Sequence, residues 1–265
     1  MMRCGSCSRS ASTQSRTESD EVWAMKYMGS KARYAKELLS IILKDRKRSQ
    51  WYVEPFVGGG NTFHLVAGNK AANDSNMYVV ALLEAVGAGW IPPEVVTEDD
   101  YKHAREHRFD MPKYEVGFIA IGTSYSGKWF GGYARGADNK GEPRNYALES
   151  RNNILKQASG LNGVYSSGDY HDMPIPPNSI IYCDPPYADT TKYDTSFDTN
   201  EFWGWCNGKV LEGHQVFVSE YSAPDSWVCV WKKAVNSSLT KQTGSKKATE
   251  KLWTKRAEIE AYLDT

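Results

Sequence analysis

The sequence predicts an α/β protein whose mostly parallel sheet is interrupted by an inserted, mainly helical subdomain. Strand and helix patterns alternate up to residue 90, break into short helices and a glycine-rich aromatic segment, and alternate again from residue 160. Alternating strands and helices form parallel sheets, because each crossover helix returns the chain to the same end of the sheet. We therefore expect one core domain made of residues 25–90 and 160–265, with residues 91–159 inserted into it.

The individual elements follow from apolar periodicity and from turn residues. An apolar stripe from Leu38 to Leu43 indicates the first helix, and a glycine-rich turn at 56–60 separates the first strand from the next helix. The predicted helices are 31–44, 61–67, 77–88, 146–158 and 201–211, and the predicted strands are 51–54, 71–74, 164–167, 179–183, 215–219 and 227–235.

Composition excludes several classes of protein. No apolar run approaches the roughly 18 residues that span a bilayer, and the N-terminus lacks the apolar centre of a secretory signal, so we expect a cytoplasmic protein without membrane contact. Residues 1–24 are rich in Ser, Thr and Arg, which predicts a disordered extension. Cys4 and Cys7 form a lone Cys-x-x-Cys without a second pair, which is weak evidence for zinc, and we expect no metal.

The net charge is zero, but the charges are unevenly placed. Residues 161–230 hold 10 acidic and 2 basic side chains, whereas residues 232–256 hold 8 basic and 1 acidic. Residues 101–160 hold 10 basic and 6 acidic side chains. Two basic faces suit a polyanionic partner, and an ordinary solvated surface is equally compatible with these counts.

The turn after the predicted strand 179–183 is the most informative segment. Asp184, Pro185, Pro186 and Tyr187 place an acid, two prolines and an aromatic ring directly after apolar residues. A carboxylate accepts hydrogen bonds from an amino group, the prolines fix the turn with a carbonyl pointing outward, and the tyrosine offers a stacking face. The segment suits chemistry on an amino-bearing ring, with a plain surface turn as the alternative.

A glycine-rich segment follows the first predicted strand, where doubly wound folds bind nucleoside-containing cofactors. Its candidate ligand-binding residues are Glu54, Pro55, Phe56, Gly58 and Gly60. Glycines let a ligand approach the backbone closely. Because the segment lacks the G-x-G-x-x-G pattern and a phosphate-binding lysine, a ligand without phosphates is favoured over a dinucleotide or ATP.

Two further strand ends carry acids. Asp74 is placed to accept hydrogen bonds from ribose hydroxyls, or to cap the following helix, and the two roles are compatible. Asp169 and Tyr170 end the strand at 164–167 and could bracket an adenine ring. Because parallel strands end at one edge of a sheet, all four segments are expected to converge there.

At this point the sequence resembles the Dam-type, or D12 class, DNA adenine N6-methyltransferases, in particular those of phages and prophages. The resemblance covers residues 26 to about 254. It rests on the ordered segments 26–31 (Lys-Tyr-Met-Gly-Ser-Lys), 54–61, 73–76, 168–170, 184–187 and 218–221. It implies a Rossmann-like, S-adenosylmethionine-dependent methyltransferase sheet with a DNA-binding insertion, acting in DNA methylation in the cytoplasm of a bacterial or phage-infected cell.

The resemblance also implies roles for residues. S-adenosylmethionine is expected with Tyr27 and Lys31 over its methionine end, the segment 54–60 as its cradle, Asp74 on its ribose and Asp169 on its adenine, and Lys31 is also expected to reach toward DNA. Taken alone, the residues 26–31 favour a helix cap with solvated lysines.

The expected mechanism follows from the substrate. The adenine N6 amino group is paired inside a duplex, so the base must be flipped out. Asp184 and the Pro185 carbonyl are expected to accept the amino hydrogens while Tyr187 stacks on the base, in a direct in-line transfer without metal or covalent intermediate.

DNA is expected to bind the inserted region and a second basic stretch. Lys128, Trp129, Tyr133 and Arg135 interleave charges and aromatics in a way that fits phosphate and base contacts, with a self-packed aromatic hairpin as the alternative. The stretch 232–256 is predicted to be a flexible basic loop whose Lys246 and Lys247 touch phosphates.

Other functions stay open at this stage. The methyl acceptor could be cytosine N4, an RNA base or a protein glutamine, although family knowledge implies that Asp184 favours adenine. A catalytically silent nucleic-acid binding module is the other class, but the acid and the glycine-rich turn that such a module would lose are both intact. A monomer is favoured.

Overall fold

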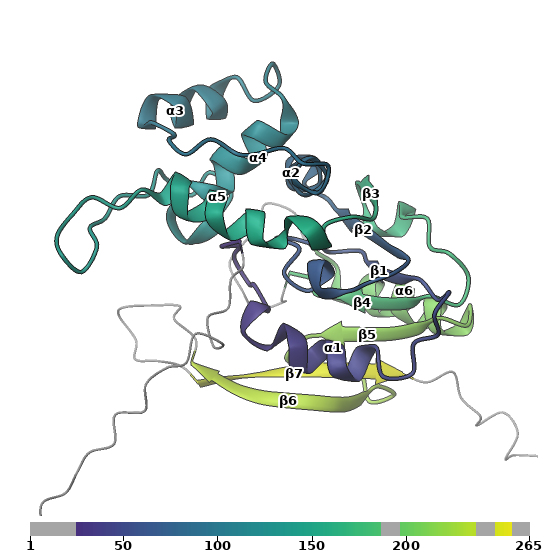
Figure 1. Cartoon of the computed structure of the whole chain (residues 1–265). Helices are drawn as coiled ribbons and strands as arrows, with labels where there is room; N and C mark the ends of the chain where they lie inside the picture. Colours follow the sequence, from purple (N-terminus) through teal and green to yellow (C-terminus); the bar gives the residue numbers. More distant parts are fainter. Residues whose placement is uncertain (1–24, 187–196, 237–246, 256–265) are drawn as a thin grey trace, which may run out of the picture.

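A seven-stranded sheet forms the centre of the molecule (Figure 1). A computed structural model describes residues 25–186, 197–236 and 247–255. The strands follow the spatial order β3-β2-β1-β4-β5-β7-β6, in which the first five are parallel and β7 runs antiparallel between β5 and β6. Their bounds are β1 Tyr52–Glu54, β2 Lys70–Asp74, β3 Val164–Ser167, β4 Ile180–Cys183, β5 Gln215–Ser219, β6 Val228–Asn236 and β7 Lys247–Lys255.

Helices cover both faces of this sheet. The helix α1 (Ala35–Ile42) shares a core with Tyr52 of β1, whereas α6 (Thr199–Leu211) shares a second core with Val53, the next residue of the same strand. Successive side chains of a strand point to opposite faces, so β1 feeds both cores at once. Both residues are fully buried, as expected for a central parallel strand.

Four helices lie between β2 and β3 in the chain and gather above the sheet in Figure 1. The backbone of α4 comes very close to α2, since a Cβ added at Gly117 would lie 2.2 Å from the carbonyl oxygen of Tyr78. Glycine is therefore required where these two helices meet. The bounds are α2 Met77–Gly87, α3 Glu98–Glu106, α4 Lys113–Gly122 and α5 Tyr146–Gln157.

Most predicted elements are confirmed, and β3 and β5 have the predicted bounds. The predicted helix at 61–67 is wrong, since only a 3-10 turn at Phe63–Leu65 forms there. The ammonium of Lys70 donates hydrogen bonds to the carbonyl oxygens of Phe63 and Val66, at 3.0 and 2.6 Å. Val66 follows in an extended conformation, with φ −94° and ψ 126°, so the helix ends after one turn.

The predicted flexible loop at 232–256 is wrong at its two ends, whereas residues 237–246 lie outside the described part of the chain. Its two ends form the antiparallel hairpin strands β6 and β7, with Lys233 opposite Glu250 and Trp231 opposite Leu252. Leu252 is fully buried, so the alternation that defines a half-buried strand is present beneath the lysines.

Several predictions concern residues outside the described part of the chain. These are the disordered extension 1–24 with Cys4 and Cys7, the aromatic Tyr187, and Lys246. Lys247 begins β7, and nothing is described of its side chain. Within the described ranges, no helix is both long enough and apolar enough to cross a membrane.

Candidate active site

The sheet reverses its order between β1 and β4. From β1 the chain moves outward to β2 and β3 on one side, and then returns to β4 and β5 on the other. In open α/β sheets, ligands bind outside the carboxyl ends of the strands at such a switch point. Tyr52 pairs with Ile180 there, so Glu54 and Asp184 follow neighbouring strands to the same edge.

The glycine-rich turn after β1 is held close to the N-terminal segment. Gly58 and Gly60 have positive φ angles of 47° and 66°. A Cβ at Gly58 would lie 2.7 Å from a ring carbon of Tyr27, and one at Gly59 would lie 2.8 Å from the Tyr27 Cβ. Tyr27 therefore packs directly on the turn, and any residue larger than glycine at position 58 or 59 would collide with it.

Asp74 braces the same turn from the end of β2. Its carboxylate accepts hydrogen bonds from the amide of Gly58 at 3.0 Å and from the amide of Asn76 at 2.9 Å. Burial raises the pKa of Asp74, and these two hydrogen bonds oppose the rise. The helix cap itself is Asn76, whose side chain accepts from the amide of Tyr78. Asp74 thus fixes the position of the turn, and this leaves its expected contact with a ribose as a prediction.

Glu54 is buried at the end of β1, with 1% of its surface exposed. The hydroxyl of Tyr52 donates a hydrogen bond to it at 2.6 Å. Burial raises the pKa of Glu54 from 4.5 to about 8, although hydrogen bonds from Tyr52 and Thr62 oppose the shift. Because the pKa of this carboxyl group lies close to neutral pH, a cation placed beside it would change its protonation state.

Aromatic rings line the β3 side of the edge. The rings of Phe56 and Tyr170 lie 5.0 Å apart and are tilted by 38°. Beside them Asp169 is exposed and accepts hydrogen bonds from the backbone and ring nitrogens of His171, both at 2.9 Å. The backbone hydrogen bond from His171 lowers the pKa of Asp169. The acid and the rings are placed together, as the sequence predicts for an adenine site.

The Asp184 turn is held by a buried cation. The ammonium of Lys31, which is 5% exposed, lies 2.8 Å from a carboxylate oxygen of Asp184. The same ammonium donates to the carbonyl of Gly29 at 3.1 Å. Pro185 is buried and Pro186 is exposed, so the turn emerges from the core at this point. In this arrangement Lys31 points into the site, beside the acid that we expect to meet the target base.

A buried polar network fastens the N-terminal segment to the core, and sequence patterns alone did not reveal it. The side chain of Gln157 on α5 donates to Asn61 at 2.9 Å and accepts from the amide of Met25 at 3.2 Å. Asn61 in turn donates to the hydroxyl of Ser30 at 2.7 Å. The network joins the segment that carries Tyr27 both to the glycine-rich turn and to the last inserted helix.

The predicted DNA-binding segment is partly packed against its own subdomain. Trp129 lies 5.2 Å from the ring of Tyr78, and the hydroxyl of Tyr133 donates to the carbonyl of Val96 at 2.7 Å. Lys128 and Arg135 are both exposed, and Arg135 forms an ion pair with Glu98.

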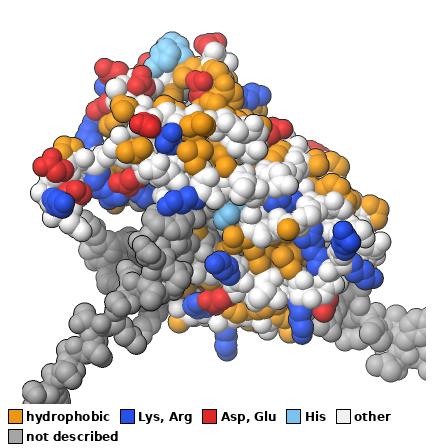
Figure 2. All heavy atoms as spheres, in the orientation of Figure 1, with side chains coloured by type: hydrophobic (Ala, Val, Ile, Leu, Met, Phe, Trp, Pro, Cys, Tyr) orange, Lys and Arg blue, Asp and Glu red, His pale blue; other side chains and the backbone are white. Residues whose placement is uncertain are grey.

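A loop leads from this segment to α5 and projects at the left of Figure 1. Residues 135–145 are all exposed, and Figure 2 shows acidic as well as basic side chains on the loop. Its four charged residues between Gly136 and Asn145 are Asp138, Lys140, Glu142 and Arg144.

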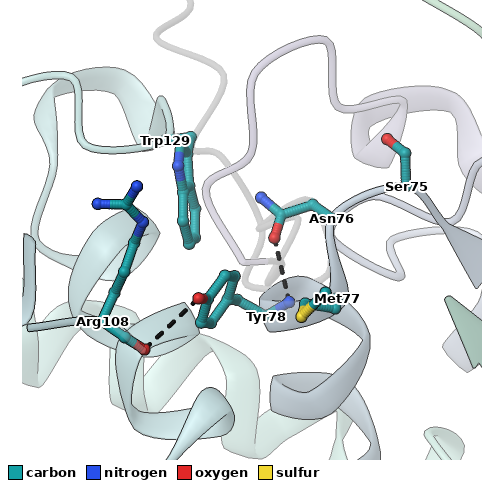
Figure 3. Close-up of a pocket in the computed structure, with 6 residues that line it drawn as sticks. All are labelled: Ser75, Asn76, Met77, Tyr78, Arg108 and Trp129. Carbon is teal, nitrogen blue, oxygen red and sulfur yellow. Dashed lines mark hydrogen bonds between the residues drawn. The ribbon is translucent and has the colours of Figure 1, made fainter. Parts of the chain in front are cut away.

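Figure 3 shows a surface hollow between this segment and the end of β2. Its volume is about 310 Å³, and the side chains of Asn76, Arg108 and Trp129 border it. The lining begins at Ser75, the residue after Asp74, so the hollow adjoins the predicted ribose position and extends from there to Arg108 and Trp129. An aromatic ring and a guanidinium suit a nucleic-acid strand.

This fold and site define a class of protein. The sheet carries acidic and glycine-rich segments at its switch point, where open α/β folds bind their ligands. Residues 27–124 match the model of the family described as D12 class N6 adenine-specific DNA methyltransferase. The match covers part of the chain, and it confirms the predicted enzyme class, an adenine-specific DNA methyltransferase, and the predicted cofactor, S-adenosylmethionine.

Other comparisons are more distant. No curated protein matches the sequence significantly. Among solved structures, PH1948 of Pyrococcus horikoshii, assigned as an RNA methyltransferase, is 12% identical with a TM-score of 0.40, over 89% of each chain. SMU.472, assigned as a methyltransferase and complexed with SAH, is 11% identical with a TM-score of 0.34, over 84% of this chain and 52% of its own. The chain thus spans about half the length of the second protein.

Proposed function

We propose that the protein methylates the N6 amino group of adenine in DNA by flipping the base out of the duplex and transferring the methyl group directly in line. The observation that carries this proposal is the meeting of Asp184 with Lys31 at the switch point, next to the glycine-rich turn. An ion pair favours the carboxylate form, which accepts hydrogen bonds but donates none. Such a group suits an amino substrate.

The residues at the edge fit S-adenosylmethionine. The turn at Gly58 and Gly59 offers backbone without side chains, Phe56 and Tyr170 offer faces for an adenine ring, and Asp169 accepts hydrogen bonds beside them. Glu54 would lie nearest the methionine end, where its buried carboxyl responds to positive charge. When bound, the cofactor supplies an electrophilic methyl group on a sulfonium.

The chain's own residues then position the acceptor. Asp184 accepts one amino hydrogen and the Pro185 carbonyl accepts the other, which turns the nitrogen lone pair toward the methyl group. Lys31 holds the carboxylate in place, so no reorientation is needed during transfer. The rate gain comes from position and local electrostatics, because neither a metal nor a covalent intermediate is required for this displacement.

Groups on the inserted subdomain support DNA as the partner. Lys128 and the hollow bordered by Arg108 and Trp129 lie on the side of the molecule that adjoins the predicted cofactor edge. A strand held there by phosphate contacts and ring stacking places an extruded base near Asp184.

Transfer of a labelled methyl group tests the proposal directly. The protein is incubated with labelled S-adenosylmethionine and duplex DNA, and digested nucleosides are separated to find N6-methyladenine. Asp184→Ala should lower transfer by about a thousandfold while leaving the fold intact. Asp45→Ala, an exposed acid in the loop that leads into β1, should retain wild-type transfer.

Three outcomes would contradict the proposal. Label on cytosine, or on RNA but not on DNA, would assign another amino acceptor. Binding of DNA without any transfer would indicate a silent module. Near-normal transfer by the Asp184→Ala variant would remove Asp184 from the mechanism.

A further inference from the structure

The strand β7 carries a buried acid in a stretch dominated by lysine. Glu250 is 8% exposed, while its neighbour Thr249 is exposed and Lys251 is half-buried. Alternation along the strand turns Glu250 inward, on the same side as the fully buried Leu252. A buried carboxylate is costly unless it is paired or hydrogen-bonded, so its contacts indicate why it is there.

The direction of β7 brings this acid to the carboxyl edge of the sheet. Leu252 pairs with Ser219, the last residue of β5, in an antiparallel register. Residues of β7 that precede Leu252 therefore extend beyond the end of β5. Glu250 reaches the edge at which Asp184 follows β4.

Lys31 lies between the two acids. Its ammonium is 2.8 Å from an oxygen of Asp184 and 4.0 Å from an oxygen of Glu250. Tyr34 is a further neighbour of Glu250. Burial is the largest cause that raises the pKa of the Tyr34 hydroxyl, and the charge of Glu250 and a hydrogen bond to Glu250 raise this pKa further. Tyr34 therefore keeps its proton and donates to Glu250, which fixes the carboxylate.

Two carboxylates thus share one buried ammonium. We infer that Glu250 is a positioning residue for methyl transfer: it draws the Lys31 ammonium partly away from Asp184 and so keeps Asp184 a strong acceptor for the target amino group. This inference rests on the proposed function. Without the charge of Glu250, Lys31 compensates Asp184 alone, and the acceptor is weakened at the step in which it is needed.

A double-mutant cycle separates this role from simple structural support. Glu250→Gln keeps the size of the side chain and removes its charge, and it should lower kcat about tenfold with little change in the KM for DNA. Glu250→Asp keeps the charge and should recover part of the loss. In a Lys31→Met background, Glu250→Gln should have no further effect on kcat, because the group through which it acts is gone.

A matched control lies on the helix α1, against the same hairpin. Glu37 of α1 forms an ion pair with Lys233 of β6, and the side chains of Glu37 and Lys233 are both exposed. Lys233 lies opposite Glu250 in the hairpin. Glu37→Gln therefore removes a carboxylate charge near the hairpin without touching the edge, and it should leave kcat unchanged.

The outcomes are distinguishable. A wild-type kcat for Glu250→Gln, or an equal loss in the wild-type and Lys31→Met backgrounds, would overturn the positioning role. If circular dichroism shows that Glu250→Gln does not fold, the same cycle with Glu250→Leu, which also removes the charge, decides. Absence of transfer by the wild-type protein on adenine-containing DNA would instead overturn the proposed function.

Discussion

The acid at the end of β1 is buried and hydrogen-bonded and the acid after β4 is half-buried and ion-paired, whereas the charged groups from Lys128 to Asn145 lie on the surface. Lys31 and Glu250 are each less than a tenth exposed, and the ammonium of Lys31 lies beside both Asp184 and Glu250. Lys128 and the loop 135–145 are exposed. One region holds its charges in a fixed geometry, and the other presents them to solvent.

This difference in burial predicts how substitutions in each region affect stability, the chemical step and DNA binding. A buried charge that loses its partner costs several kcal/mol, whereas an exposed pair contributes between roughly 0 and 1 kcal/mol. Substitutions at the edge should therefore slow the chemical step and also lower the free energy of unfolding, although the variants still fold. Substitutions in the exposed segment should change DNA affinity and its salt dependence, and leave the chemistry alone.

The largest effect is expected where the turn touches Tyr27. In Gly59→Ala, the new Cβ would lie 2.8 Å from the Tyr27 Cβ and 3.0 Å from the Asn61 amide nitrogen, so both must move. Because this displaces the cradle, the affinity for S-adenosylmethionine should fall about a hundredfold, measured by calorimetry. Gly204→Ala in α6 is the control, since a Cβ there meets nothing within 4 Å. Equal affinities in both variants would show that the turn does not hold the cofactor.

Unfolding measured at several pH values tests whether the carboxyl group of Glu54 is buried and protonated. Because burial raises the pKa of Glu54 to about 8, the folded protein keeps a proton that the unfolded chain releases near 4.5. Stability should therefore fall as the pH rises from about 5 to 8, by up to about 1.4 kcal/mol per pH unit. Glu54→Gln should flatten this slope in urea unfolding at pH 5.5, 6.5 and 7.5. Parallel slopes for the two proteins would place the titration elsewhere.

The exposed segment should respond more weakly. Lys128→Ala should reduce DNA affinity severalfold and lower the salt slope by about one, as expected for one lost phosphate contact. Its kcat at saturating DNA should stay at the wild-type value. Lys209→Ala is the control, because Lys209 pairs with Glu212 on α6. A change in kcat for Lys128→Ala would break the division between the two regions.

The smallest effect separates packing from DNA contact within that segment. Tyr133→Phe removes the hydroxyl that donates to Val96, which should cost about 1 kcal/mol of unfolding free energy. DNA affinity should not change, because the hydroxyl is used inside the subdomain. Filter binding and thermal unfolding measure the two quantities, and loss of affinity without loss of stability would assign Tyr133 to the interface.

Local patterns predicted the strands and the edge well. The four segments after β1 to β4 each have a signature that depends only on neighbouring residues, and parallel pairing brings them together. What local patterns could not predict are contacts between distant parts of the chain, such as Lys31 with Asp184 or Gln157 with Met25. The hairpin strand β7 was missed because its lysines mask the alternation.

One signal for Glu250 was nevertheless present in the sequence. It is the single acid among eight basic residues in 232–256. An isolated opposite charge in a basic run is unlike the mixed charges of a solvated surface, and here it marks the position that turns inward. The pairing with Lys31 itself required the register of β7 against β5.

The antiparallel course of β7 also sets the order in which the protein becomes competent during synthesis. The N-terminal segment with Lys31 emerges first, but its partner Glu250 arrives only with the last strand, and the ion pair of Glu37 with Lys233 likewise joins residues 196 apart. Nascent chains fold from the N-terminus as they emerge. A growing chain can thus build the parallel strands before Glu250 reaches Lys31, so we expect full activity only after the hairpin has docked.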